Sequence, residues 1–92
     1  MSTDLQELTK SKQQLMPKYK VLLHNDDVNS CDYVVACLLK TVNTLNVKRA
    51  IEIMFEAHNT GIALVAVVPL EIAEFYKENL VSFGLTSTIE PE

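Results

Sequence analysis

The 92-residue chain has no tryptophan and only two glycines, Gly61 and Gly84. A glycine-rich loop of the kind that cradles phosphate groups is therefore absent from the sequence. Basic residues are also scarce, because 8 Lys and Arg face 12 Asp and Glu, which gives a formal net charge of -4. No basic cluster offers the charge that phosphate binding needs, so we expect no nucleic acid partner.

Long hydrophobic runs are missing as well. The longest are residues 34–39 and residues 62–70, the second broken by Pro69, and both are far shorter than the roughly 20 residues that span a bilayer. No signal-type apolar segment precedes a cleavage site. We therefore expect no membrane partner and a location in the cytoplasm, or in the plastid stroma of a plastid-bearing organism.

The cysteines show neither a disulfide pattern nor a metal-binding pattern. Cys31 and Cys37 fall on different faces of one expected helix, which disfavours a bond between them. With His24 and His58 they lack the CxxC or HxxxH spacing of a zinc site. We expect no metal and no cofactor.

The first 17 residues are polar and end at Pro17. They are typical of a flexible N-terminal arm, which leaves residues 18–92 as the folded domain. The alternative is a weak amphipathic turn whose apolar side chains are Leu5, Leu8, Leu15 and Met16.

Two consecutive helices are predicted in the middle of the chain. Ser30 can cap a helix over residues 31–42, whose apolar stripe comprises Val34, Val35, Leu38, Leu39 and Val42. Asn46 can cap a second helix that begins at Val47 and ends before Gly61. The apolar positions with the spacing of one helix face are Val47, Ala50, Ile51, Met54 and Ala57.

Three strands and a third helix complete the pattern. Residues 19–23 and 85–89 indicate short strands, and the continuously apolar residues 62–68 predict a central strand buried on much of both faces. Pro69 opens the third helix, which ends at Gly84 and whose expected buried side comprises Ile72, Ala73, Phe75, Tyr76, Leu80 and Phe83. The order β-α-α-β-α-β favours an α+β fold with a three-stranded sheet and the helices packed on one face.

Asn25, Asp26 and Asp27 follow the first strand directly, although a plain turn needs only one such residue. Beside the apolar start of the next helix, their oxygen atoms suit a cation attached to a hydrophobic group, such as a free protein N-terminus. An ammonium group has three donors and no acceptor, so it prefers carboxylate, amide oxygen and neutral imidazole. His58 could supply the imidazole, or it could be a half-exposed histidine near a negative helix end.

Four segments of the sequence resemble the bacterial Clp protease adaptor family ClpS. They are YKVLLHNDDVNSCDYVV, RAIEIMFEAHNTG, LEIAE and the ending Leu85 to Glu90, which together cover the chain from Tyr19 to Glu90. The NDD triplet alone is a weak signal, whereas NDD followed about 32 residues later by H-x-x-G, with A-x-x-I-M before it, is a specific combination. The resemblance implies an antiparallel three-stranded sheet with three helices, in agreement with the element order above.

The resemblance also implies a function. ClpS-like proteins bind N-degrons, which are destabilising N-terminal residues, and deliver the proteins that carry them to an Hsp100 unfoldase, ClpA or ClpC, for degradation by ClpP. The residues that match those holding the α-amino group are Asn25, Asp26, Asp27 and His58. The residues that match the side-chain pocket are Leu23, Asn29, Cys31, Val34, Met54, Ala57 and Leu85.

The sequence departs from the family pattern in places that bear on specificity and docking. The family's Thr-Pro-Met after NDD is Asn29-Ser30-Cys31 here, so a cysteine replaces the gatekeeping methionine. The segment between LEIAE and the last strand is shorter; Glu71 matches the acidic unfoldase-docking position, and Tyr76 stands at the basic one. These changes indicate a divergent branch, such as the second form found in cyanobacteria.

Two other functional classes stay open at this point. The element order also resembles the C-terminal domain of the ribosomal stalk protein, an interaction module that does not bind N-degrons. A hydrolase built on Asp26, Asp27 and His58 would need a nucleophile and an oxyanion loop, and the sequence shows neither. We therefore predict a binding protein rather than an enzyme.

Overall fold

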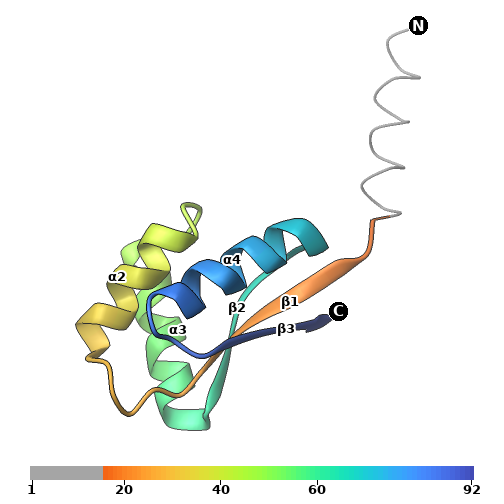
Figure 1. Cartoon of the computed structure of the whole chain (residues 1–92). Helices are drawn as coiled ribbons and strands as arrows, with labels where there is room; N and C mark the ends of the chain where they lie inside the picture. Colours follow the sequence, from red (N-terminus) through yellow and green to blue (C-terminus); the bar gives the residue numbers. More distant parts are fainter. Residues whose placement is uncertain (1–15) are drawn as a thin grey trace, which may run out of the picture.

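The computed structural model describes residues 16–92, so the predicted arm of residues 1–17 lies outside the described residues except for Met16 and Pro17. Three strands and three helices follow one another in the order β-α-α-β-α-β, which confirms the predicted α+β fold (Figure 1). In order they are β1 (Lys18–His24), α2 (Cys31–Thr41), α3 (Val47–Thr60), β2 (Ile62–Pro69), α4 (Leu70–Ser82) and β3 (Ser87–Pro91). None of the helices between residues 16 and 92 has both the length and the hydrophobicity to cross a membrane.

The sheet has the strand order β2-β1-β3, and both pairings are antiparallel. The prediction that residues 62–68 form the central strand is therefore wrong, because β1 is central and β2 is an edge strand (Figure 1). Val21 pairs with Ala66 and Leu22 with Leu64, which leaves Val65 unpaired in a bulge. Every residue from Ile62 to Val68 is apolar although the strand lies at the edge and Ile62 is 41% exposed, so the apolar run did not reveal the position of the strand.

The helices begin and end where the sequence predicts. The Ser30 hydroxyl accepts a hydrogen bond from Tyr33 N at 3.2 Å, and Asn46 Oδ1 accepts one from Arg49 N at 2.7 Å. Gly61 has φ 91°, the left-handed conformation that lets the chain leave α3 and enter β2. These caps fix the start of α2 and the end of α3 at the same end of the sheet as the last residue of β1.

The core lies between one face of the sheet and the helices. Val21 and Leu23 of β1, which point to this face, are 0% and 1% exposed. Each such side chain contributes roughly 1.5 to 3 kcal/mol relative to an exposed one. The buried residues of α3 are Ala50, Ile53, Met54 and Ala57. The predicted face of α3 was therefore partly wrong, because Ile53 replaces Val47 and Ile51, which are both exposed.

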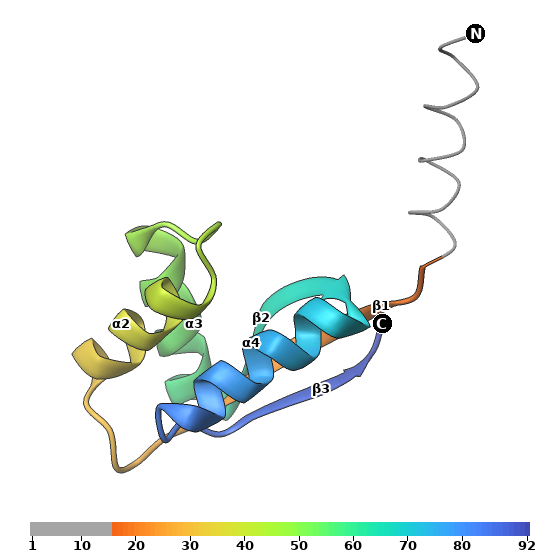
Figure 2. The ribbon, with the colours of Figure 1, turned by 45° about the horizontal axis from the view of Figure 1, so that its top comes forward.

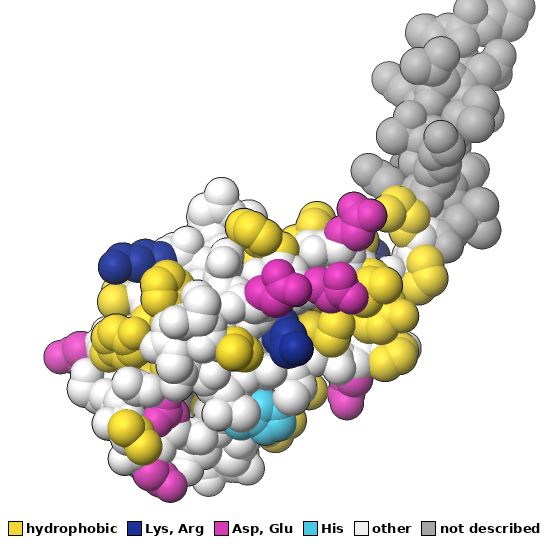
Figure 3. All heavy atoms as spheres, viewed as in Figure 1, with side chains coloured by type: hydrophobic (Ala, Val, Ile, Leu, Met, Phe, Trp, Pro, Cys, Tyr) yellow, Lys and Arg dark blue, Asp and Glu magenta, His cyan; other side chains and the backbone are white. Residues whose placement is uncertain are grey.

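Helix α4 lies over the sheet and buries a narrower side than the sequence predicts (Figure 2). Ala73 and Leu80 are buried, and Tyr76 and Phe83 are partly buried against the core. Ile72 and Phe75, however, are exposed, which corrects the prediction for these two positions. Only one side of α4 faces the sheet, and hydrophobic side chains appear among acidic ones on the surface of the molecule (Figure 3).

Candidate functional site

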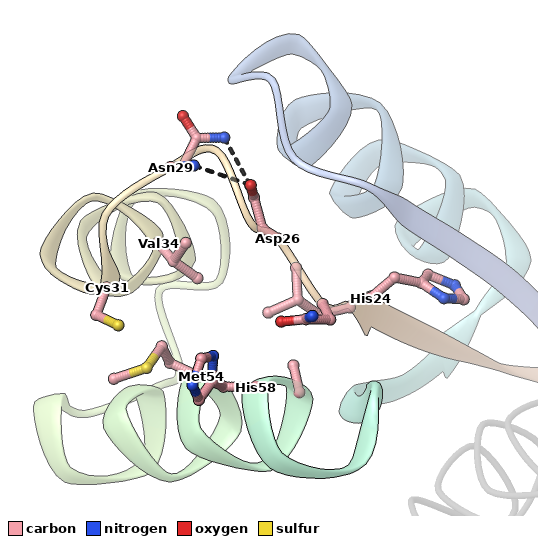
Figure 4. Close-up of a pocket in the computed structure, with 10 residues that line it drawn as sticks. His24, Asp26, Asn29, Cys31, Val34, Met54 and His58 are labelled. Carbon is pink, nitrogen blue, oxygen red and sulfur yellow. Dashed lines mark hydrogen bonds between the residues drawn. The ribbon is translucent and has the colours of Figure 1, made fainter.

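A small hollow opens where β1 ends, between the first turn of α2 and the second half of α3 (Figure 4). The hollow is small and open to solvent. The lining residues are Leu23, His24, Asn25, Asp26, Asn29, Cys31, Val34, Met54, Ala57 and His58. All of them except His24 belong to the sets predicted from the sequence, whereas Asp27 and Leu85 of those sets do not line the hollow.

One side of the hollow is apolar and belongs to the core. Leu23, Val34, Met54 and Ala57 are each at most 7% exposed. Met54 and Ala57 lie on one face of α3 because they are three positions apart, and Cys31 and Val34 do the same on α2. Cys31 is exposed, so its thiol stands at the mouth rather than in the depth of the hollow.

The other side is the loop after β1, and Asp26 organises it. Its Oδ1 accepts hydrogen bonds from the backbone nitrogens of Val28 at 2.8 Å and Asn29 at 2.9 Å. Its Oδ2 accepts a bond from the Asn29 side-chain amide at 2.6 Å (Figure 4). The bonds from Asn29 hold the pKa of Asp26 below its ordinary value, with a smaller contribution from Val28. The carboxylate therefore stays ionised and keeps a negative charge beside the hollow.

Asn25 and Asp27 lie next to each other with different relations to the hollow. Asn25 lines it, and its amide nitrogen donates to Asp27 Oδ1 at 3.2 Å. That bond leaves the carbonyl oxygen of Asn25 as the acceptor it can offer to a ligand. Asp27 does not line the hollow, and its side chain is joined to it through the bond to Asn25.

The loop is also tied to the turn that follows α4. The Asn29 amide donates to the Gly84 carbonyl at 3.2 Å, and the Tyr33 hydroxyl donates to the Phe83 carbonyl at 2.6 Å. Leu85, predicted as a pocket residue, is 4% exposed and packs in the core next to this turn. This turn therefore supports the hollow from behind without lining it.

The two histidines point in different directions. His24 is the last residue of β1, and its ring points away from the hollow, where Nε2 is 2.7 Å from Thr88 Oγ1 (Figure 4). Strand alternation gives the reason, because Leu23 faces the core and the next side chain must face the open side of the sheet. His58 is exposed in the last turn of α3 and stands beside Met54 at the hollow. A ligand in the hollow can reach its ring.

The arrangement combines oxygen acceptors and a negative charge with an apolar wall. A ligand that carries a cationic group directly on an apolar side chain satisfies both sides at once. A neutral apolar ligand would leave the carboxylate side unused, and a hydrophilic cation would leave the apolar wall uncovered. The geometry therefore favours an amine attached to a hydrophobic group.

Comparison with known proteins gives a consistent result. The sequence profile of the family described as "ATP-dependent Clp protease adaptor protein ClpS" matches residues 14–88. The chain is 58% identical over 76 residues to the ATP-dependent Clp protease adapter protein ClpS of Synechococcus sp. (strain CC9902), covering 83% of this chain and 73% of that protein. It is 50% identical over 84 residues to the protein of the same name from Synechococcus elongatus, covering 91% of this chain and 88% of that protein.

A solved structure is similar too. The structure of Agrobacterium tumefaciens ClpS2 bound to L-phenylalaninamide superposes with a TM-score of 0.77 at 30% sequence identity. The similarity covers 83% of this chain and 98% of that one. The resemblance therefore extends over nearly the whole of the neighbour's fold.

Proposed function

The chain belongs to the ClpS family of ATP-dependent Clp protease adaptors, and we propose that it binds proteins through a destabilising N-terminal residue. It then delivers them to an Hsp100 unfoldase, ClpC or ClpA, for degradation by ClpP. It acts by binding and carries out no catalysis. Membership in this family decides against the ribosomal-stalk alternative.

The main observation behind this proposal is that one hollow has oxygen acceptors on one side and an apolar wall on the other. The N-terminus of a protein has an ammonium group and a side chain on the same carbon atom. L-phenylalaninamide, which the Agrobacterium relative binds, has the same two groups. The hollow offers a partner to each of these groups, oxygen acceptors for the ammonium and an apolar wall for the side chain.

Three residues are assigned to the α-amino group. The Asn25 carbonyl oxygen and a ring nitrogen of His58 accept hydrogen bonds from it, and the Asp26 carboxylate supplies the opposite charge. Asp27 orients Asn25 through the bond to its amide nitrogen. The first side chain of the substrate enters between Leu23, Val34, Met54 and Ala57, with Asn29 and Cys31 at the rim.

The direct test is a binding scan with labelled peptides that differ only in their first residue. All twenty residues are compared by fluorescence anisotropy. We expect micromolar or tighter binding for Leu and the aromatic residues, and weak binding for charged first residues, which would bury a second charge against an apolar wall. A flat ranking over all twenty would contradict the proposal.

His58→Ala should weaken the binding of a Leu-first peptide by about tenfold, because one acceptor of the ammonium group is lost; a hydrogen bond to a charged group is worth roughly 1.5 to 3 kcal/mol. The melting temperature should change little, since the His58 side chain is exposed. Asn59→Ala is the matched control, because Asn59 is an exposed neighbour on α3 that does not line the hollow. Equal affinities for the His58 and Asn59 variants would remove His58 from the site.

Cys31 should reduce the differences in affinity between peptides that begin with different apolar residues. A cysteine in place of the family's methionine removes volume at the mouth, and His24 does not fill the space because its ring points away. β-Branched residues should enter more easily, and Ile should bind within about tenfold of Leu, roughly 1.4 kcal/mol. Cys31→Met should widen the gap, whereas Cys31→Ser, which keeps the small volume, should not. A hundredfold preference for Leu that Cys31→Met leaves unchanged would contradict the volume argument.

Docking on the unfoldase is assigned to the exposed side of α4 and to the arm. Glu71 is exposed in the first turn of α4 and fits the acidic docking position. Tyr76 is half-buried, with its ring centroid 6.4 Å from that of Phe75, so it presents only part of its side chain. Residues 1–17 are proposed to act on the unfoldase and not on the hollow.

A further inference from the structure

An apolar strip of three side chains, Val47, Ile51 and Phe55, lies exposed along α3. They are 57%, 38% and 51% exposed. Because they are four positions apart, they share one side of the helix. That side adjoins the one from which Met54 and His58 reach the hollow.

The fold does not need this strip. The side of α3 that packs on the core is made by Ala50, Ile53 and Ala57, which are at most 3% exposed. Single exposed apolar residues are common on protein surfaces. A row of three that continues from a pocket is different, because contiguous exposed apolar surface marks interaction sites.

The direction of a bound peptide follows from where the acceptors lie. Asn25 N donates to the Gly61 carbonyl at 2.9 Å, so the amine-binding loop adjoins the C-terminal end of α3. The order His58, Met54, Ile51, Val47 therefore leads away from the amine. In Figure 4, Met54 and Cys31 stand at the side of the hollow opposite β1. With its amine held at the loop, a peptide leaves past Met54 and toward the strip.

The distances fit the next two residues of a substrate. A helix rises 1.5 Å per residue, so Ile51 lies about 4.5 Å along α3 from Met54 and Val47 about 10 Å. An extended peptide advances roughly 3.3 Å per residue, so its second and third residues extend about 7 Å and cover Ile51, while Val47 lies at the far end of the strip. The strip has no charged member. The nearest ion pair, Arg49 with Glu52 at 3.4 Å, lies on another side of the helix.

We propose that the apolar strip is a second subsite, which binds apolar side chains at the second and third positions of the substrate. This inference rests on the proposed function. It narrows the substrate class to proteins whose destabilising first residue is followed by apolar residues. A second copy of the chain or another protein on the strip would be a different occupant, and a strip that serves only such an occupant would not change the peptide ratio measured below.

The experiment uses three ligands with the same first residue. They are leucinamide, a decapeptide beginning Leu-Ser-Ser and an otherwise identical decapeptide beginning Leu-Leu-Leu. We expect the Leu-Leu-Leu peptide to bind about three- to tenfold more tightly than the Leu-Ser-Ser peptide, from burial of apolar area on the strip. Phe55→Ser and Ile51→Ser should each reduce this ratio toward one, while leucinamide binds as before.

Phe75→Ser is the matched control, since Phe75 is a phenylalanine of similar exposure on α4, at 59% against 51% for Phe55. It should leave the ratio unchanged. A ratio near one in the unmodified protein, or a ratio that Phe55→Ser and Ile51→Ser do not alter, would overturn the second subsite while leucinamide binding still supports the proposed function. If neither leucinamide nor either peptide binds, the proposed function and the subsite both fail.

Discussion

Acetylating the α-amine of a Leu-first peptide should weaken its binding by roughly 2 to 5 kcal/mol, from about thirtyfold to several thousandfold. The acetyl group removes the positive charge and two of the three donors. The Asp26 carboxylate, which is held ionised by the loop, then faces a neutral amide. Because the hollow is partly open to water, we expect a result toward the lower end of this range.

A monomethylated amine separates the contribution of charge from that of size. It keeps the positive charge and two donors and adds a single methyl group, so its affinity should fall between those of the free and the acetylated peptide. Isothermal titration of the three peptides measures the differences. Equal affinities for the free and the acetylated peptide would show that the hollow does not recognise the amine.

Asp26→Ala should reduce peptide affinity by more than about tenfold and lower the free energy of unfolding by roughly 1 to 3 kcal/mol. The substitution removes an acceptor of three hydrogen bonds that hold the loop in place, together with the charge beside the hollow. Asp27→Ala is the matched comparison. Within residues 16–92 its carboxylate accepts a single hydrogen bond, at 3.2 Å from Asn25, so we expect a smaller loss of affinity and little change in stability.

The pH dependence provides a second measurement for Asp26. Its pKa lies below the ordinary value of 3.8 in the folded protein, so its stabilising effect is complete above that value and is lost as the pH falls through the lowered folded pKa. The wild type should therefore be more stable than Asp26→Asn at neutral pH, and the difference should shrink in acid. Thermal melts from neutral to acidic pH measure it. A difference that is the same at every pH would contradict the role of the ionised carboxylate.

The secondary structure was predictable because its signals are local. Ser30 and Asn46 cap their helices, and Gly61 takes a conformation that glycine adopts at little cost. The position of β2 in the sheet could not be predicted from local sequence. It depends on which strands pair across the whole chain, and a continuous apolar run reads like a buried strand. The inner side of α4 was mistaken because Ile72 and Phe75 are apolar without facing the sheet.

For the site, the sequence predicted most of the side chains that line the hollow. It did not predict which of the candidate residues line it directly and which lie outside it. The places of Asn25 and Asp26 follow from the end of β1, and those of Met54 and Ala57 from helix spacing. The separation of Asp26 from Asp27 depends on hydrogen bonds within the loop. The burial of Leu85 depends on how the turn after α4 packs, which no local pattern encodes.

The wall of the hollow is made of the same side chains that hold the domain together, and this restricts how the protein can change over evolution. Replacing a core residue such as Leu23 or Met54 with alanine typically costs 2 to 5 kcal/mol of stability. A domain of this size has only about 5 to 15 kcal/mol in total. Mutations that change the deep wall can therefore unfold the domain, whereas substitution of Cys31 at the exposed mouth should cost little stability. Lineages that acquire new substrates should therefore differ first at the position of Cys31. The residues of the deep wall, such as Leu23 and Met54, should be substituted more slowly.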